Sequence, residues 1–444
     1  MLLLITGGSR GLGRAIGKVF TKQYIDIDSV GNNGTDNGDG NNDRNAFATT
    51  TSNNNSSNKS NDENDDEIIK KRQTLLLTII LVSRDMNGLQ ETSKQIFEQI
   101  PRQQQDQKQQ QQQQPDIIQP ATKRIRIDDD DRMTETAAAA AAAPSTTTST
   151  SSMSSQRHQQ QRTMTMSIGG GNIELTVQVI CHSMDLSNLD ILDTNLDMIF
   201  KDIPTGTCPA TYDSIILVNN AGSIGYIGNI ASNSPANTLQ NMKSNIELNI
   251  TSSLWITTRF LRHTTVATTS NAKTTNTATS TLTTSNNNIF VVNISSLTAI
   301  SNNFPTLGIY SAGKACRNKF HTMIATELQS QESESHESSS AGDDKNSSNS
   351  NIKIINYAPG PLETQMVTEI RSNFDTLHNT LKPSYSDPTL LLQPEQSATK
   401  LYKLINSLMI GVESNDNTTT TAVLDDYSKI QFKSGDHIDY YDLP

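Results

Sequence analysis

The chain has 444 residues and a formal net charge of −11 at pH 7, and 34% of its residues are hydrophobic and 5% aromatic. A globular protein is about 45 to 50% apolar with glycine counted, so much of this length lacks the side chains for a core. The acidic balance argues against a protein that binds nucleic acid through a basic face.

The three cysteines, Cys181, Cys208 and Cys316, form no CxxC pair, which argues against a disulfide framework and a thiolate zinc site. The longest apolar run, from Leu75 to Val82, is less than half of the roughly 20 residues that a membrane helix requires. Residues 1–5 are apolar but lack the basic flank of a signal peptide. We therefore expect a cytoplasmic protein that binds neither a membrane nor nucleic acid.

Four polar, low-complexity segments interrupt the chain, and we expect them to be disordered insertions. They cover about residues 26–70, 101–172, 264–288 and 330–351. The remainder, about 280 residues, is the size of a single α/β domain, so residues 1–444 are predicted to hold one domain. Two other interpretations stay open: the alanine run 137–143 can form a helix, and residues 123–126 can act as a nuclear targeting signal.

Short runs rich in Leu, Ile and Val alternate with helix-length segments in the remainder, which predicts strands buried on both faces of a parallel sheet. The predicted strands are 2–6, 75–82, 175–180, 215–219, 289–294 and 352–357. The predicted helices are 12–23, 89–99, 189–200, 245–261, 310–328 and 396–408. This alternation predicts an α/β fold, a Rossmann-type doubly wound parallel sheet with the insertions in its connections.

A glycine-rich turn, TGGSRGLG, runs from Thr6 to Gly13 between the first predicted strand and the first predicted helix. Glycines let the backbone approach a phosphate, and the N-terminus of a helix adds N–H donors and partial positive charge. The turn therefore predicts a dinucleotide site. The expected contacts are Gly7, Ser9, Arg10, Gly11, Leu12 and Gly13.

The end of the second predicted strand indicates which dinucleotide binds. Its first charged residue is Arg84, and Arg10 in the glycine turn adds a second cation. A guanidinium suits a 2′-phosphate, whereas a carboxylate at this position suits a free 2′-hydroxyl. The cofactor NADP (NADPH) is therefore favoured, and Asp85 directly after Arg84 keeps NAD open.

Tyr310 and Lys314 are four residues apart on a predicted helix, so the phenol and the ammonium lie on one helical face. A neighbouring cation favours the phenolate, so we expect Lys314 to lower the pKa of Tyr310 from its usual value near 10. Such a tyrosine can protonate a carbonyl oxygen while a hydride reaches the carbon. Ser296, after the preceding strand, can hold that oxygen, and Ser295 is the competing candidate.

Together these motifs resemble the short-chain dehydrogenase/reductase family, through TGxxxGxG from Thr6, NNAG at 219–222 and the spacing of Tyr310 and Lys314. The resemblance implies a catalytic tetrad of Tyr310, Lys314, Ser296 and Asn249, in which Asn249 orders a water. It also implies further cofactor contacts from Asp185, Leu186, Asn220, Gly222, Tyr310, Lys314, Pro359, Gly360, Leu362 and Thr364. The spacing from Ser296 to Tyr310 is slightly long for the family, which predicts a small bulge within residues 298–309.

Within this family, several segments resemble the sepiapterin reductases. They are 219–225, 293–297, 356–366 and the tail 432–442. The resemblance implies NADPH-dependent reduction of the side-chain carbonyl of a pterin, sepiapterin or a pyruvoyl-tetrahydropterin, in tetrahydrobiopterin biosynthesis. It implies that Asp439 anchors the pterin, that Met366 lines the pocket, and that Ser296 and Tyr310 contact the substrate. It further implies a homodimer through helices 245–261 and 310–328.

Two other functions remain open at this point. A general carbonyl or diketone reductase would keep the same tetrad, and the acidic residues of the tail would then be merely solvated. A non-catalytic module that senses a dinucleotide would use the polar segments to bind partners. The complete tetrad argues against this second alternative.

Overall fold

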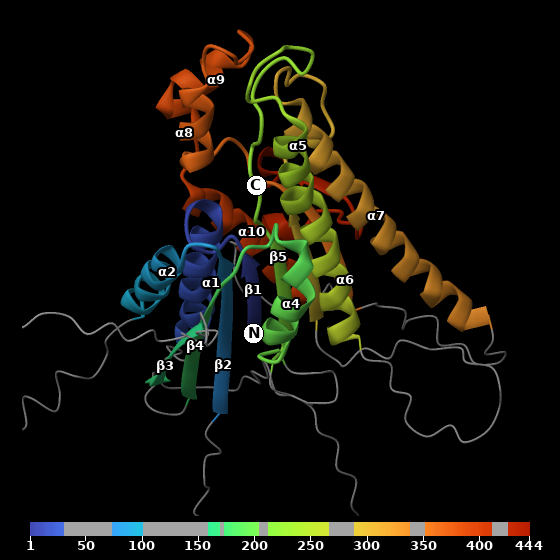
Figure 1. Cartoon of the computed structure of the whole chain (residues 1–444). Helices are drawn as coiled ribbons and strands as arrows, with labels where there is room; N and C mark the ends of the chain where they lie inside the picture. Colours follow the sequence, from blue (N-terminus) through green and yellow to red (C-terminus); the bar gives the residue numbers. More distant parts are fainter. Residues whose placement is uncertain are drawn as a thin grey trace, which may run out of the picture. The chain divides into compact units, whose positions relative to one another are not determined.

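A single sheet with the strand order β3-β4-β2-β1-β5-β6-β7-β8 forms the centre of the described structure, and every neighbouring pair is parallel except β3 and β4 (Figure 1). The strands are β1 (Leu2–Thr6), β2 (Gln73–Ser83), β3 (Gln159–Ile168), β4 (Ile173–Ser183), β5 (Ser214–Asn219), β6 (Asn288–Ile294), β7 (Ile352–Ala358) and β8 (His437–Asp439). This sheet confirms the predicted doubly wound α/β fold.

The computed structural model describes residues 1–30, 73–100, 159–168, 173–203, 212–265, 288–337, 351–410 and 425–444. All of them belong to one unit of the chain. The alanine run 137–143 and the basic residues 123–126 lie outside the described residues, so both interpretations of them stay predictions. Within the described part of the chain, no helix is long and apolar enough to cross a membrane.

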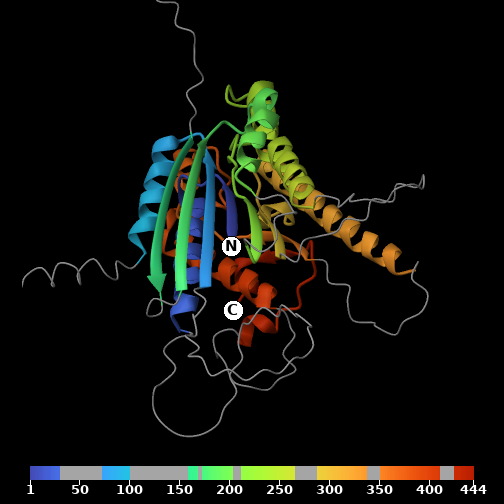
Figure 2. The ribbon, with the colours of Figure 1, turned by 90° about the horizontal axis from the view of Figure 1, so that it is seen from below.

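Helices cover both faces of the sheet (Figures 1 and 2). One layer holds α1 (Gly11–Val30), α2 (Met86–Glu98) and α10 (Pro394–Ile410), and the other holds α4 (Leu192–Phe200), α6 (Ser253–Thr264) and α7 (Gly308–Glu337). Because successive strand residues point to opposite faces, Leu3 and Ile5 of β1 pack in the first layer, whereas Leu2 and Leu4 pack in the second. The uninterrupted apolar runs of the sequence are therefore strands with a core on each side.

Shorter helices lie beyond the carboxyl ends of the strands. They are α5 (Leu239–Ile246), the π-helical turn η3 (Glu247–Ser252), α8 (Gln365–Ser372) and α9 (Lys382–Ser386). A last short helix, α11 (Asp425–Ser428), precedes β8. The periodicity of the sequence did not predict α8 and α9, because each is shorter than three turns.

The prediction that residues 101–172 form one disordered insertion was wrong for its last part. Residues 159–168 form β3, an antiparallel strand at the edge of the sheet that pairs along its whole length with β4 (Figure 2). In the second half of its sequence, QQQRTMTMSI, polar and apolar residues alternate, which is the two-residue period of a strand. Helices α1 and α7 also continue into the segments predicted as insertions, to Val30 and Glu337.

The centre of the sheet positions the site. From β1 the chain proceeds to β2 and β4 on one side and later to β5, β6 and β7 on the other, so β1 and β5 are neighbours whose connections leave in opposite directions. In open parallel sheets a crevice forms at such a point, outside the carboxyl ends of the strands, and ligands bind there.

We predict that residues 101–158 can be replaced by a flexible linker without loss of stability, whereas removal of 101–172 lowers the melting temperature by several degrees. The larger deletion removes the cross-strand pairs of β3, each worth roughly 0.2–1 kcal/mol, and the contact of Arg162 with the ring of Phe97 at 5.0 Å. A linker of about fifteen residues spans the length of β3 in the first variant. Thermal unfolding of both variants measures the difference, and equal melting temperatures would contradict a structural role for β3.

Candidate active site

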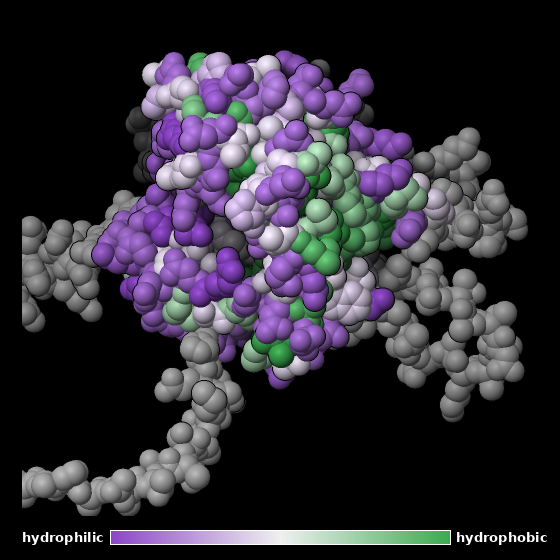
Figure 3. All heavy atoms as spheres, turned by 45° about the horizontal axis from the view of Figure 1, so that its top comes forward, coloured by the Kyte–Doolittle hydropathy of each residue, from purple (hydrophilic) through white to green (hydrophobic). Residues whose placement is uncertain are grey.

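One cavity of about 870 Å³ opens where the carboxyl ends of β1, β5, β6 and β7 meet, a volume suited to a ligand of cofactor size. Its lining combines the glycine turn after β1, the NNAG segment after β5, Ser295 and Ser296 after β6, and residues 359–370 after β7. Figure 3 shows that this end of the molecule is mostly hydrophilic, with exposed apolar side chains gathered in one area.

Thr6 joins the ends of β1 and β5 beneath the glycine turn. Its hydroxyl oxygen accepts hydrogen bonds from the backbone N–H groups of Asn220 and Ala221, each at 3.0 Å. The side-chain amide of Asn220 donates in return to the carbonyl oxygens of Thr6 and Gly7, each at 3.1 Å. Gly7 has a φ of 72°, a left-handed conformation that favours glycine. These hydrogen bonds therefore fix the backbone conformation of the glycine turn relative to the end of β5.

Gly13 was predicted to contact the cofactor, and the structure places it beneath the turn, outside the lining of the cavity. A Cβ atom at Gly13 would lie 2.3 Å from the carbonyl oxygen of Gly7 and 2.7 Å from the side-chain nitrogen of Asn220. Glycine is needed here for the close approach of α1 to the turn. The other predicted residues of the turn, Gly7 and Ser9 to Leu12, line the cavity.

The cavity reaches the ends of β2 and β4, where Arg84 and Asp185 line it. Their side chains are 63% and 43% exposed, and the Nη1 of Arg84 lies 3.9 Å from the Oδ2 of Asp185. The hydroxyls of Ser9 and Ser83 form a hydrogen bond at 2.9 Å beside them. Asp85 is the residue that left NAD as an alternative cofactor. It caps α2, because its carboxylate accepts a hydrogen bond from the N–H of Gly88 at 2.9 Å.

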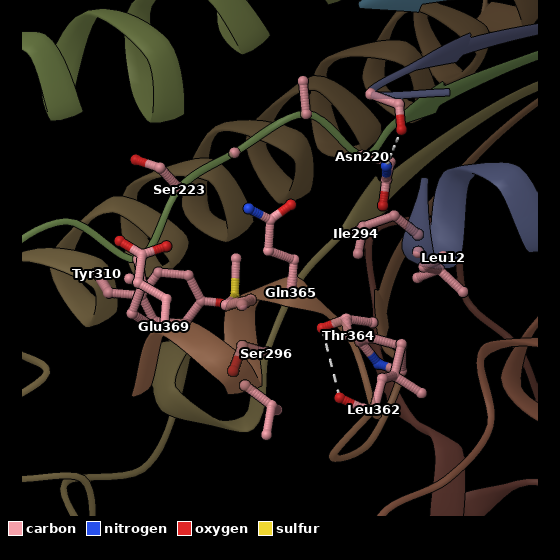
Figure 4. A pocket seen from close by; sticks show the side chains of 18 of the residues that line it. Leu12, Asn220, Ser223, Ile294, Ser296, Tyr310, Leu362, Thr364, Gln365 and Glu369 are labelled. Carbon is pink, nitrogen blue, oxygen red and sulfur yellow. Dashed lines mark hydrogen bonds between the residues drawn. The ribbon is translucent and has the colours of Figure 1, made fainter. Parts of the chain in front are cut away.

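Tyr310 and Lys314 lie on the first turns of α7 and line the same cavity, with 9% and 4% of their surfaces exposed. The ammonium of Lys314 donates to the carbonyl oxygen of Ile294, the last residue of β6, at 2.6 Å. Its Nζ lies 5.6 Å from the centre of the Tyr310 ring. In Figure 4 the side chains of Tyr310 and Ser296 lie around one space, together with Gln365 and Glu369 from α8.

The expectation that Lys314 lowers the pKa of Tyr310 was wrong. Burial and the neighbouring Tyr385 raise the pKa of Tyr310 to about 12, and the opposing effects come from a hydrogen bond with Ser296 and from the charge of Arg317. Lys314 is itself buried, and both this burial and the charge of Arg317 hold its pKa well below the usual value. Arg317, a cation that the motifs did not reveal, thus affects the pKa of both groups.

The two candidate serines point in different directions. The hydroxyl of Ser295 is buried and donates to Asn318 of α7 at 2.5 Å, within a network of buried amides that includes Asn293 and Asn356. Ser296 is only partly buried and hydrogen-bonds with Tyr310. The geometry therefore favours Ser296 over Ser295 as the hydroxyl beside the phenol.

Asn249 does not line the cavity but lies directly behind it. Its side chain accepts from the N–H of Ser223 at 2.9 Å and donates to the carbonyl oxygen of the same residue at 2.8 Å. Its side-chain nitrogen also donates to the side-chain oxygen of Asn245 on α5 at 2.9 Å. Asn249 lies in η3, and π-helical turns often occur at functional sites. Ser296, Tyr310 and Lys314 of the predicted tetrad thus line the cavity, whereas Asn249 contacts it through Ser223.

The loop between Ser296 and Tyr310 was predicted to carry a bulge. It contains a short 3₁₀ turn, Leu297–Ala299, and Thr306 has a φ of 72°, which is unusual for a residue other than glycine. The carbonyl oxygen of Thr306 accepts from Gly228 at 2.9 Å, and its hydroxyl accepts from the N–H of His378 at 3.1 Å. These bonds tie the loop to both walls of the site.

Both residues predicted to contact only the substrate, Met366 and Asp439, line the cavity. Met366 packs against the apolar cluster around Tyr310. Asp439 ends β8 and also caps the turn that follows, since its Oδ1 accepts from the N–H of Tyr441 at 3.0 Å. Its carboxylate therefore has a structural role in addition to any contact with a ligand.

Several lining residues between β7 and α10 had no signal in the sequence. Tyr385, Glu369 and Gln365 line the cavity from α8 and α9. Arg371 holds these helices to the loop after β7 through a forked ion pair with Glu363, at 2.9 and 3.1 Å, and through a bond to the carbonyl oxygen of Tyr385 at 2.8 Å. Only the apolar spacing of 366, 367 and 370 hinted at a packed helix here.

The glycine turn, the tetrad and the doubly wound sheet together are similar to the short-chain dehydrogenase/reductase class of oxidoreductases. Within this class, the chain is similar to sepiapterin reductases. It is 27% identical to the sepiapterin reductase of Rattus norvegicus over 267 residues, which are 60% of this chain and 77% of that protein. The protein of Mus musculus is 27% identical over 53% of this chain and 66% of its own length.

Similarity also extends to a benzil reductase of Bacillus cereus, 25% identical over 51% of this chain and 75% of that protein. No protein-family model matches the chain. The names of these relatives are all those of reductases, so the chain is similar to oxidoreductases.

Similar solved structures include a 3-oxoacyl-[acyl-carrier protein] reductase from Brucella melitensis with NAD, with a TM-score of 0.41 and 12% identity over 91% of this chain and 88% of that chain. A polyketide ketoreductase with NADPH has a TM-score of 0.42 and 13% identity over 93% of this chain and 90% of that chain.

The homodimer stays a prediction, and Ile246 on α5 and Met323 on α7 are exposed apolar residues on the helices that it would use.

We predict that Gly13→Ala lowers the melting temperature by several degrees, because a methyl group 2.3 Å from a backbone oxygen forces α1 away from the turn. Overpacking of this kind costs roughly 1–3 kcal/mol. Gly17→Ala is the matched control in the same helix, since its Cβ would meet only the flexible end of Ile96 at 3.3 Å. Thermal unfolding compares the two variants, and equal effects would show that helix propensity rather than close approach decides the result.

Proposed function

We propose that the protein is an NADPH-dependent reductase of the side-chain carbonyl of a pterin such as sepiapterin. The supporting observation is that one cavity holds three features: a glycine turn at a helix N-terminus, a buried tyrosine with a serine hydroxyl, and a carboxylate from the C-terminal tail. The first suits a dinucleotide, the second suits a carbonyl, and the third suits the edge of a pterin.

The described residues fit a nicotinamide dinucleotide. Gly7 leaves the turn without a side chain, and the first turn of α1 carries no acidic residue that would repel a phosphate. The turn and the start of α1 would hold the pyrophosphate, and Lys314 would donate to the nicotinamide ribose. When bound, the reduced dinucleotide supplies a hydride to the carbonyl carbon.

The residues of this chain supply the proton and the orientation. Tyr310 donates its phenolic proton to the carbonyl oxygen as that oxygen gains negative charge, and the hydroxyl of Ser296 positions the oxygen beside the phenol. The raised pKa of Tyr310 keeps it protonated at neutral pH, as an acid must be before it donates. The apolar residues around the ring, among them Ile224, Leu307 and Ile370, exclude water from the reacting atoms.

Asp439 supports a pterin over other carbonyl compounds. A pterin presents two N–H donors side by side on its pyrimidine edge, and a carboxylate can accept both in a forked geometry. The carboxylate of Asp439 lines the same cavity as Tyr310, so it can bind one end of the ligand while the side chain of the pterin reaches the phenol.

We predict that Asp439→Asn raises the KM for sepiapterin about tenfold or more, the effect of a lost hydrogen bond to a charged group, and leaves benzil reduction unchanged. Asparagine keeps an oxygen that can accept from Tyr441, so the cap of the last turn survives. NADPH oxidation followed at 340 nm measures both substrates, with Tyr310→Phe as the inactive reference. An unchanged sepiapterin rate would contradict the pterin proposal, and equal losses on both substrates would indicate a folding defect.

A general diketone reductase is the second candidate, and the apolar lining of the cavity favours it. Phe304, Tyr385 and Leu381 offer contacts to any aromatic ketone of suitable size. The similarity to a benzil reductase supports the same alternative. The experiment on Asp439 separates the two, because a diketone has no donor pair for a carboxylate.

Preference for NADPH over NADH is proposed from the surroundings of Arg84. Arg84 and Arg10 both line the cavity at its ribose end, beside the Ser9 and Ser83 hydroxyls. Asp85 is engaged as the cap of α2, which weakens the case for it as a ligand of a free 2′-hydroxyl. The two guanidinium groups suit a 2′-phosphate.

We predict that Arg84→Ala raises the KM for NADPH about tenfold and leaves that for NADH unchanged, because only NADPH loses a charge-assisted bond. Arg162→Ala, which removes an exposed arginine from β3, is the control for a general change in charge. Steady-state rates with each dinucleotide decide the matter, and a parallel change in both KM values would count against a 2′-phosphate contact.

A further inference from the structure

Arg317 is a charged residue without any exposed surface, and it lies two helical turns after Tyr310 on α7. Its guanidinium donates to the carbonyl oxygen of Asn219 at 2.5 Å, to that of Ala221 at 3.2 Å and to the side-chain oxygen of Asn293 at 2.8 Å. These acceptors belong to the end of β5 and the end of β6. One side chain therefore ties α7 to two strand ends that line the site.

Each of these acceptors is a neutral oxygen, and within the described residues no ion pair involves Arg317. A buried cation is costly when no opposite charge compensates it. Burial lowers the pKa of Arg317 to about 10, and the group that opposes this effect is Tyr310. Reciprocally, Arg317 lowers the pKa of Tyr310. Tyr310 lies two turns before Arg317 on the same face of α7, so a phenolate at Tyr310 would place a counter-charge on the side of the helix that holds this guanidinium.

The groups around Arg317 leave its charge intact. His321 on the next turn bonds to the carbonyl oxygen of Arg317 at 2.8 Å and to Thr257 of α6 at 3.1 Å, and burial lowers its pKa to about 3, so it is neutral. Thr257 in turn accepts from the side chain of Asn219 at 2.6 Å, which closes a ring of buried bonds. The other titratable groups around the phenol are Lys314 on α7 and Tyr385 on α9, and Glu369 on α8 and Asp439 at the end of β8 line the same cavity.

We propose that Arg317 is a positioning residue that fixes the ends of β5 and β6 against α7 and places a buried, uncompensated positive charge behind the phenol of Tyr310. This inference rests on the proposed function only for its consequence in catalysis. When Tyr310 gives its proton to the carbonyl oxygen, the O–H bond of the phenol breaks and a phenolate remains. Arg317 stabilises this phenolate before a proton from solvent restores the phenol.

The test compares Arg317→Met, which removes the charge, with Arg317→Lys, which keeps it. Each protein is labelled with 3-fluorotyrosine, because fluorine lowers the pKa of a phenol and brings its titration into the range in which proteins stay folded. The chain has 10 tyrosines, and the resonance absent from Tyr310→Phe identifies Tyr310 in ¹⁹F spectra recorded against pH. We expect the midpoint of Tyr310 to rise by about one pH unit or more in the Met variant and by less than half as much in the Lys variant.

The catalytic consequence is measured separately. With any carbonyl that the native protein reduces, kcat at pH 7 should fall about tenfold in the Met variant, which corresponds to one unit of phenol pKa, while the Lys variant recovers most of the rate. An unchanged Tyr310 midpoint in Arg317→Met, with kcat lowered equally in both variants, would overturn the electrostatic role and leave a structural one. If the Met variant does not fold, Arg317→Gln takes its place, since glutamine keeps a donor for the strand ends without the charge.

The titration needs no substrate, so failure of the proposed function is distinguishable from failure of this inference. A native protein that reduces no pterin and no diketone, but whose Tyr310 midpoint depends on the charge at 317, would reject the function and retain the role of Arg317. Pterin turnover together with a Tyr310 midpoint that does not depend on the charge at 317 would retain the proposed function and reject the role of Arg317.

Discussion

The carboxyl ends of the parallel strands meet at one edge of the sheet, and every part of the candidate site depends on this constraint. Residues that directly follow β1, β5, β6 and β7 are far apart in the chain but become neighbours around one cavity. The constraint itself comes from composition, because strands rich in Leu, Ile and Val must be covered on both faces. Helical connections provide that cover, and they carry each strand back to run in the same direction.

The same geometry explains how the chain accommodates its long polar segments. Residues 31–72, 204–211, 266–287 and 338–350 each join the end of a helix to the start of a parallel strand. The amino ends of the strands lie at the edge opposite the site, so these segments begin and end away from the cavity. Residues 101–158 differ, because they lead into the antiparallel β3, which starts beside the carboxyl end of β4. Loop closure adds little cost with length, so such insertions leave the core intact.

Buried charge organises the centre of the site. Lys314 and Arg317 are both removed from water on one face of α7, and the described residues offer them carbonyl and amide oxygens as partners. Burial and, to a smaller extent, repulsion from Arg317 lower the pKa of the lysine. Burial raises the pKa of the Tyr310 phenol on the same helix, and the charge of Arg317 opposes this rise. This arrangement suits a residue that must release a proton and take it back.

The sequence alone predicted the six central strands of the sheet, the glycine turn and the pairing of Tyr310 with Lys314 on one helix, because these depend on local patterns: apolar runs, glycines between a strand and a helix, and a tyrosine four residues before a lysine. Tertiary structure decided what depends on distant partners. Only the fold shows that Ser295 faces Asn318 while Ser296 faces Tyr310, that residues 159–168 pair with β4, and that α8 and α9 close the cavity. The role of Arg317 belongs to this second group, because the three oxygens that bind it lie roughly 25 to 100 residues away along the chain and meet only at the edge of the sheet.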